Sequence, residues 1–156
     1  MKQLSLVADK TKTAGIIRNI LGMNNSPRIY FQGRLEREKE LFRALNPVRV
    51  RYHDAAIENS GFALVDVSRI FPLFHADEND PANYDFQPTD CYFRQAVECG
   101  AKIEIRLGET IEHSPEQFRV HPPSDPEKWA RICINIIRHY NEGWGGGMRL
   151  GIGHVS

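Results

Sequence analysis

The spacing of apolar residues changes several times along the chain, from alternation to helical spacing and back. Short β-branched runs predict strands, and longer segments with apolar residues three or four positions apart predict helices. The strongest helical stripe follows the i, i+3, i+4, i+7, i+8 and i+11 positions: Trp129, Ile132, Cys133, Ile136, Ile137 and Tyr140. We expect strands at 15–22, 48–53 and 102–108 and helices at 34–45, 88–99 and 126–140, while 148–155 is compatible with a fourth short strand.

Capping and terminating residues mark the ends of the predicted helices. Ser124 or Asp125 can cap the last helix, and Pro126 suits its first turn, where a missing N–H costs nothing. Pro47 stops the first helix and Gly100 the second. In the first helix the apolar residues are Leu35, Leu41, Phe42 and Leu45, and we expect a solvated outer face of Glu36, Arg37, Lys39 and Glu40.

Strands that alternate with helices predict an α/β fold with right-handed crossovers and a parallel sheet. The stretch 54–86 interrupts this order, since it is rich in Asn, Asp, Pro and Gly. Within it, 62–67 and 70–74 are apolar enough to be ordered and partly buried. A loop of this length inside one domain is usually functional.

Composition narrows the function classes. The 156 residues carry 20 Lys+Arg and 20 Asp+Glu, so the formal net charge is zero, which argues against a partner of nucleic acid or anionic membrane. No apolar run approaches the ~20 residues of a membrane span, and charges at Asp9 and Lys10 come too early for a secretory signal. We therefore expect a soluble, cytoplasmic protein.

The three cysteines are expected to be packed and reduced, with a redox or metal role as the alternative. Cys91 and Cys99 lie eight residues apart on one predicted helix, roughly 12 Å along its axis. Disulfide geometry requires Cα atoms within about 7 Å, so this pair cannot form a bridge.

Chemistry in parallel α/β folds gathers in the loops that leave the carboxyl ends of the strands. The polar residues at these positions are Asn24 and Asn25 after the first strand, His53, Asp54 and Glu58 after the second, and Glu109, Glu112, His113 and His121 after the third. A metal site built from His53, Asp54, Glu109 and His113 is one alternative, although no His-Glu-x-x-His spacing supports it. The segment 77–80 resembles a calcium loop only in composition, and we expect a solvated turn there.

Sequence motifs for covalent or cofactor chemistry are missing. The chain has no Gly-x-Ser-x-Gly, Gly-x-Gly-x-x-Gly or P-loop, so we expect no cofactor. Aromatic residues in or next to loops match the lining of a sugar site, or else pack under the long loop: Tyr30, Phe31, Phe71, Phe74, Tyr84 and Phe86. Both interpretations remain open for each of them.

Four segments together resemble the amino-terminal half of glycoside hydrolase family 39, which contains β-xylosidases and α-L-iduronidases. They are 23–27 (MNNSP), 48–53 (VRVRYH), 83–90 (NYDFQPTD) and 122–129 (PPSDPEKW), and the likeness covers about 13–145. The resemblance implies a (β/α)8 TIM barrel and retaining hydrolysis by two glutamates. By position it also implies that His53 contacts the sugar, and Asn24, Glu109 and His113 are further candidate substrate-binding residues.

The family's acid/base glutamate lies in a Trp-Asn-Glu-Pro stretch at the end of the fourth strand, and its nucleophile follows the seventh. This sequence contains neither, so no catalytic residue is assigned. A full barrel takes ~250 residues, which predicts that 1–156 is a truncated catalytic domain with about the first three to four βα units. Such a half-barrel should have open strand edges and an uncovered hydrophobic face.

Three functions follow from these observations. The first is a fragment of a retaining glycosidase of the β-xylosidase type, with an oligosaccharide or glycoside as partner. The second is a non-catalytic sugar-binding module, and the third is a metal-dependent sugar isomerase-like enzyme. The sugar, its anomer and the oligomeric state are left open.

Overall fold

A computed structural model describes residues 4–7, 9–12, 14–25, 27, 35–52, 64–111, 115–117, 121–153 and 155. Three parallel strands form one sheet in the order β1 (Gly22–Asn24), β2 (Arg49–Arg51) and β3 (Lys102–Glu104). Four helices are α1 (Leu35–Leu45), α2 (Val67–Ile70), α3 (Gln87–Glu98) and α4 (Pro126–Asn141), and two 3₁₀ turns are η1 (Pro81–Asn83) and η2 (Trp144–Gly146). The predicted α/β fold with a parallel sheet is confirmed.

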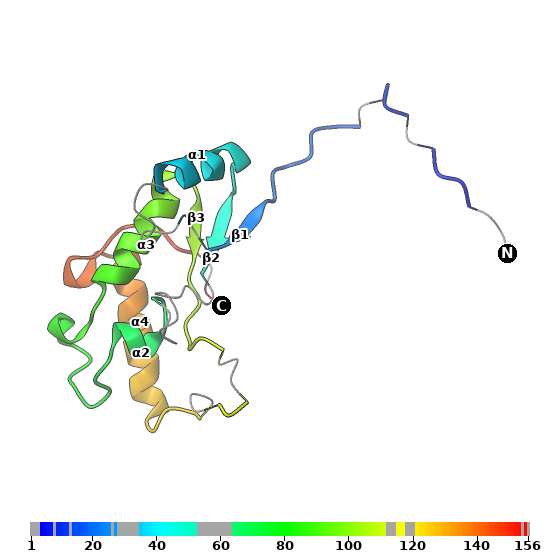
Figure 1. The fold of residues 1–156 in the computed structure, drawn as a ribbon. Coiled ribbons are helices and arrows are strands. Elements are labelled where there is room, and N and C mark those ends of the chain that lie inside the picture. The colour runs from blue at the N-terminus through cyan, green and yellow to red at the C-terminus, as the bar shows by residue number, and fades with distance from the viewer. Residues whose placement is uncertain are drawn as a thin grey trace.

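The first strand lies later in the sequence than predicted. The run 15–22 was expected to form it, but β1 begins only at Gly22, and Ile16 and Ile17 are 99% and 91% exposed. The ladder starts where the Val48 N–H donates to the Leu21 carbonyl at 2.9 Å. The described residues before Leu21 extend beyond the start of β2 and run away from the body of the molecule (Figure 1). Ile16 and Ile17 have β-branched side chains but pair with no strand in the part of the chain that the structure describes.

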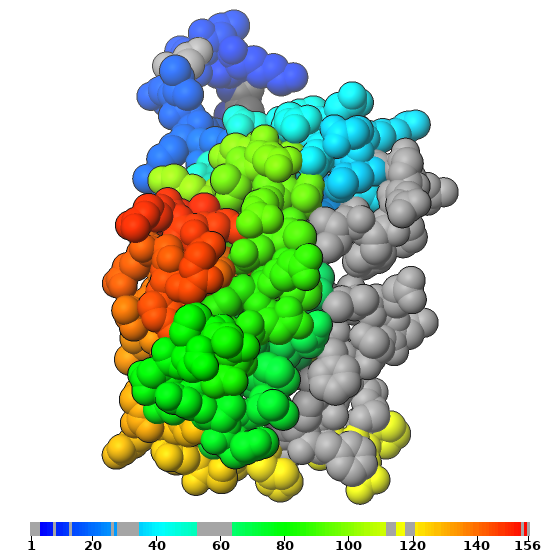
Figure 2. Space-filling model, turned by 90° about the vertical axis from the view of Figure 1, so that its left-hand side faces the viewer, coloured from blue at the N-terminus to red at the C-terminus, as the bar shows by residue number. Residues whose placement is uncertain are grey.

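The segment expected as a fourth strand forms a single bridge, next to the end of β3. Val155 forms a parallel bridge with Ile105, just beyond the end of β3. Before it, the chain is bound to the end of α4, because the Leu150 N–H donates to the Tyr140 carbonyl at 2.8 Å and the Asn141 side chain bonds both backbone groups of Ile152. Figure 2 shows this segment, in red, beside α3 in green and α4 in orange.

The helices α3 and α4 lie on one side of the sheet (Figure 1) and bury its core. Both form where periodicity predicted them, and the Asp125 carboxylate caps α4 by accepting from the Lys128 N–H. Side chains with 0% exposure in this core come from β2, from the residue directly after it, and from α3 and α4: Val50, Tyr52, Phe93, Ala96, Ile132, Ile136 and Tyr140. No helix among the described residues is long and apolar enough to cross a bilayer.

Polar contacts fasten the two helices to each other and to the long loop. His139 of α4 lies 3.1 Å from the Asp90 carboxylate of α3 and stacks on the Phe86 ring. The Thr89 hydroxyl donates to the Leu64 carbonyl, so α3 also holds the start of the segment 64–67. Of the two segments expected to be partly buried, 64–67 and 70–71 are buried, Leu73 is 55% exposed, and residues 62 and 63 lie outside the described residues. Of the cysteines, Cys133 is buried in the core, where desolvation raises the pKa of its thiol to about 12.

The helix α1 buries a different face from the one expected. Lys39 is only 7% exposed, whereas Leu41 and Leu45 are 58% and 54% exposed. The Lys39 ammonium donates to the Glu98 carboxylate of α3 at 2.7 Å, and this hydrogen bond raises the pKa of Lys39. The aliphatic stem of a lysine can cover apolar surface while its charge is paired, so Lys39 replaces a leucine at this contact.

The acidic segment 77–80 is not simply a solvated turn. Glu78 is 8% exposed, and its carboxylate lies 2.6 Å from Arg131 and 3.4 Å from Lys128, both on α4. Asn135 donates to the Glu78 carbonyl at 2.7 Å. These contacts attach the loop before η1 to α4, and the hydrogen bonds of Arg131 lower the pKa of the Glu78 carboxyl to about 2.

Substitutions at a buried and an exposed isoleucine of α4 can test which face of this helix packs in the core. Ile136 has 0% exposure and Ile134 has 54%. Ile136→Ala should lower the free energy of unfolding by about 2–5 kcal/mol, because it removes buried methyl groups and leaves a cavity. Ile134→Ala should change it by less than about 1 kcal/mol, since it leaves no cavity. Chemical denaturation of both variants measures the difference, and equal losses would contradict the packing of α4.

The Glu78 network predicts a specific acid sensitivity. The folded-state pKa of about 2 lies below the ordinary value of 4.5, so the stabilisation is complete above pH 4.5 and is lost as the pH falls towards 2. Glu78→Gln should lower the free energy of unfolding at pH 7 and reduce its decline between pH 4.5 and 2. Glu40→Gln, on exposed α1 surface, should leave both unchanged. An undiminished acid decline in Glu78→Gln would contradict this assignment.

Candidate functional site

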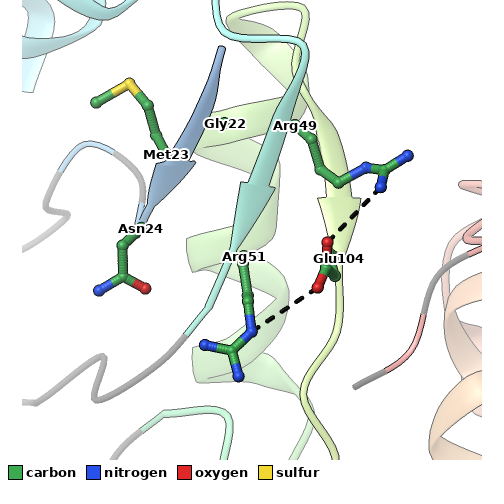
Figure 3. A pocket seen from close by; sticks show the side chains of 6 residues that line it. All are labelled: Gly22, Met23, Asn24, Arg49, Arg51 and Glu104. Carbon is green, nitrogen blue, oxygen red and sulfur yellow. Dashed lines mark ion pairs between the residues drawn. The ribbon is translucent and has the colours of Figure 1, made fainter. Parts of the chain in front are cut away.

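The sheet face opposite the core carries polar side chains. Arg49, Arg51 and Glu104 alternate with the buried Val50 and Ile103, so they lie on the other side of the sheet. With Gly22, Met23 and Asn24 they line a cavity of about 370 Å³, which we call the sheet hollow (Figure 3). The hydrophobic face expected for a half-barrel is therefore not what these strands present.

Glu104 holds the charged side chains of the sheet hollow in place. Its two carboxylate oxygens lie 3.7 Å from the Arg49 and Arg51 guanidinium groups, one oxygen to each. All three side chains are partly exposed, so the ion pairs add little stability. The ion pairs instead keep two guanidinium groups close together on one face of the sheet.

Asn24 stands at the carboxyl end of β1, as the sequence predicted for a site residue. Cross-strand register places it beside Arg51, which in turn pairs with Glu104. The next residue, Asn25, has a φ of 63° and donates its N–H to the Arg51 carbonyl at 3.0 Å. Asparagine tolerates this left-handed conformation better than most residues.

The end of β2 is anchored in the core. Tyr52 has 0% exposure, packs against the rings of Tyr92 and Phe93, and donates its hydroxyl to the Tyr92 carbonyl at 3.2 Å. The predicted site residue His53 follows immediately but lies outside the described residues, as do Asp54, Glu58, Glu112 and His113. The buried Tyr52 therefore fixes the position of the chain at the end of β2.

The loop after β3 is bound to the start of α2 by a buried carboxylate. Asp66 has 0% exposure, lies 3.6 Å from the Arg106 guanidinium and accepts from the Thr110 hydroxyl at 2.7 Å. The Val67 N–H donates to the Gly108 carbonyl at 3.0 Å. A buried charge is costly unless paired, so these contacts hold the two segments together.

Glu109, another predicted site residue, bonds to α2. Its carboxylate accepts from the Ser68 N–H at 2.9 Å and from the Ser68 hydroxyl at 2.6 Å. The first-turn N–H groups of a helix have no partner inside the helix, and a carboxylate there is favourable. Glu109 thus acts as a cap for α2 from a distant part of the sequence.

A second cavity of about 370 Å³ lies between α2, the loop after β3 and the first turns of α4. We call it the aromatic cavity; its lining includes Glu109, His121, Phe71, Phe74, Trp129 and Ile132. Phe71 and Phe74 were among the aromatic candidates for a ligand site. Tyr84 and Phe86 instead stack on each other in the core, 8% and 7% exposed, and Tyr30 and Phe31 lie outside the described residues.

The candidate residues that the structure describes do not converge on one site. Asn24 lines the sheet hollow and Glu109 lines the aromatic cavity. Within the described ranges, no group of three or more His, Cys, Asp or Glu side chains is arranged to hold a metal ion. Sequence reasoning missed Arg49, Arg51 and Glu104, although strand alternation in 48–53 and 102–108 already placed polar residues on one face.

The fold is similar to that of a known protein, although the sequence itself matches no family model. No protein-family model matches the sequence, and no curated protein matches it. The structure is similar to the crystal structure of a glucosidase from Croceicoccus marinus, with a TM-score of 0.70 and 23% sequence identity. The match covers 92% of this chain and 29% of the glucosidase chain. The chain therefore has a glycosidase-like fold and spans less than a third of that protein's length.

The bond between Glu109 and Ser68 can be tested directly. Glu109→Ala should speed hydrogen exchange of the Ser68 amide by about tenfold or more, because a hydrogen bond to a charged group contributes about 1.5–3 kcal/mol. Glu127→Ala, on the exposed first turn of α4, should leave the exchange of this amide unchanged. The exchange rate of the Ser68 amide is measured by NMR in both variants. An unchanged rate in Glu109→Ala would show that Glu109 does not cap α2.

Proposed function

We propose that this chain forms about the first three to four βα units of the (β/α)8 barrel of a retaining glycoside hydrolase of the β-xylosidase type, within family 39. In this proposal it binds an oligosaccharide or glycoside and carries neither catalytic glutamate. The main support for this proposal is the order of the sheet. Three parallel strands are neighbours in the order in which they occur in the sequence, and Val155 pairs with Ile105 where a fourth strand would follow β3. The likeness to part of a glucosidase supports the same arrangement.

The sheet hollow has the chemistry that a sugar ring requires. Sugar hydroxyl groups both donate and accept hydrogen bonds, and the hollow offers an amide, two guanidinium groups and a carboxylate from Asn24, Arg49, Arg51 and Glu104. Its volume of about 370 Å³ falls in the range of small-molecule sites. In a closed barrel this face would point inwards, and Asn24 stands at the carboxyl ends where barrel enzymes bind substrates.

Each candidate residue has a role in this proposal. Asn24 and His53 contact the sugar ring from the ends of β1 and β2, and His113 contributes from the loop after β3. Glu109 contacts a part of the substrate beyond that ring, since it lines the other cavity. Retaining hydrolysis needs two carboxyl groups about 5–5.5 Å apart, and Glu104, the carboxylate among the lining residues of the hollow, is engaged by two arginines.

Titration with disaccharides tests the proposal. Xylobiose should cause saturable amide shifts in NMR spectra at Asn24 and Arg51, and it should bind more tightly than cellobiose. Asn24→Ala should weaken xylobiose binding by about tenfold, the value of one or two hydrogen bonds. Asn79→Ala, which lines neither cavity, is the matched control and should bind like the unmodified chain.

Three outcomes would contradict parts of the proposal. Absence of saturable sugar binding would exclude the sugar-binding function. Tighter binding of cellobiose would exclude the xylosidase type. Hydrolysis of an aryl xyloside by the pure chain, abolished by changing one of its own Asp or Glu residues, would show that the chain does carry catalytic carboxylates.

A further inference from the structure

His139 lies where α3, α4 and the turn after α4 meet. The residue is 1% exposed, and its ring stacks on the Phe86 ring with 3.5 Å between the centroids. The two ring nitrogens face different partners. Nε2 lies 3.1 Å from a carboxylate oxygen of Asp90 on α3, and Nδ1 lies 2.8 Å from the Trp144 carbonyl oxygen in η2. Each nitrogen is therefore within hydrogen-bonding distance of an oxygen.

Both partners are acceptors, and this determines how many protons the ring must carry. A carboxylate and a backbone carbonyl have no hydrogen to donate, whereas a neutral imidazole has one N–H and one nitrogen lone pair. In a neutral ring, one of the two contacts would place that lone pair against the lone pairs of an oxygen. Only a doubly protonated ring donates to Asp90 and to Trp144 at the same time.

The charge of Asp90 supports this assignment. A protonated Asp90 carboxyl could donate to Nε2 of a neutral ring, but imidazole is a stronger base than a carboxylate. The Arg94 guanidinium lies 3.6 Å from the other Asp90 carboxylate oxygen and favours the ionised form. The proton therefore belongs to His139, whose buried positive charge is compensated by Asp90 and by the face of the Phe86 ring.

The tyrosines beside this junction keep their protons near neutral pH. Burial, together with the negative charge of Asp90, raises the pKa of Tyr140 well above its ordinary value. Tyr84 stacks on the far side of Phe86, and burial raises the pKa of its hydroxyl as well. Neither hydroxyl therefore changes its charge in the range where histidines ordinarily titrate.

Arginines border the junction on the side of the turn. The Arg138 guanidinium lies over the Trp144 ring and pairs with Glu142 at 3.1 Å, and the Arg149 guanidinium lies against Gly143. Arginine stays charged in proteins and Glu142 is ionised near neutral pH. These charges are constant there, so a change of charge at the junction near neutral pH comes from His139.

Loss of one proton from the ring breaks the contact with Trp144 rather than the contact with Asp90. A hydrogen bond to an ionised acceptor is about twice as strong as one between neutral groups, so the remaining proton stays on Nε2. Nδ1 then presents its lone pair to the Trp144 carbonyl oxygen at 2.8 Å, and that contact becomes repulsive.

The turn 143–147 is packed too closely against α4 to absorb this repulsion in place. A Cβ at Gly147 would overlap the His139 carbonyl, and a Cβ at Gly145 would lie 2.9 Å from the Pro81 side chain. The Gly147 N–H donates to the Trp144 carbonyl at 3.2 Å, so movement of that carbonyl also frees the Gly147 amide. The segment 148–155 begins directly after this turn.

We propose that His139 is a proton-dependent switch for this turn: the doubly protonated ring holds the turn 143–147 on α4, and loss of the Nδ1 proton to water releases it. Because the closed turn requires the protonated ring, the contact is present at low pH and is lost as the pH rises. The proposal depends only on contacts around His139 and does not rest on the proposed function.

Nitrogen NMR shifts of the His139 ring measure its protonation directly in the full chain. Both ring nitrogens should carry a proton at pH 7, and Nδ1 should lose its proton first as the pH is raised to about 9. Over the same range the protection factor of the Gly147 amide, which corrects for intrinsic exchange, should fall at least about tenfold. The Ile136 amide, in the middle of α4, should keep its protection.

Asp90→Asn separates the switch from general alkaline destabilisation. The asparagine amide can donate to Nε2 of a neutral ring, which leaves the single ring proton on Nδ1 for the Trp144 carbonyl. In this variant the Gly147 protection factor should no longer fall between pH 7 and about pH 9. His75→Gln, which replaces an exposed histidine, is the matched control and should retain the tenfold fall.

Three results would overturn the proposal. A His139 ring with a single proton at pH 7 would refute the assigned protonation state. Unchanged Gly147 protection while Nδ1 loses its proton would refute the link between the ring and the turn. A fall of Gly147 protection in Asp90→Asn equal to that in the unmodified chain would also refute it. If Asp90→Asn does not fold, the first two measurements on the unmodified chain still decide the outcome.

Discussion

Parallel pairing of β2 with β1 on one edge and β3 on the other determines which side chains face the helices. The pairing aligns Val50 with Ile103 and Arg51 with Glu104. Because side chains alternate along a strand, a shift of one residue would turn Val50 to the open face and bury Arg51. The free-energy cost of burying an arginine makes that register inaccessible, and so the core and the sheet hollow are fixed by the same hydrogen bonds.

Charge in this protein is balanced locally as well as in total. The chain has equal numbers of acidic and basic residues, and several of them are paired inside the structure. Lys39 with Glu98 joins α1 to α3, and Glu78 with Arg131 joins the loop before η1 to α4. A pair that loses one member leaves a desolvated charge behind, so such pairs specify which segments meet even where they add little stability.

The two cavities follow from two different structural causes. The sheet hollow exists because strand alternation places polar side chains on the face opposite α3 and α4. The aromatic cavity exists because Asp66 and Glu109 hold the loop after β3 against α2, while α4 supplies Trp129 and Ile132.

The sequence alone determined the helices α1, α3 and α4, the order of the elements and the parallel sheet, because apolar periodicity and capping residues are local signals. It placed Asn24 at a strand end and predicted Phe71 and Phe74 as candidate ligand contacts. It misplaced β1, because the isoleucines at 16 and 17 have strand propensity and only the position of β2 decides which residues find a partner. It also assigned Lys39 and Glu78 to solvent, since their ion-pair partners are 59 and 53 residues away. The grouping of Arg49, Arg51 and Glu104, the bond from Ser68 to Glu109 and both cavities arise from contacts between distant segments, which only the tertiary structure decides.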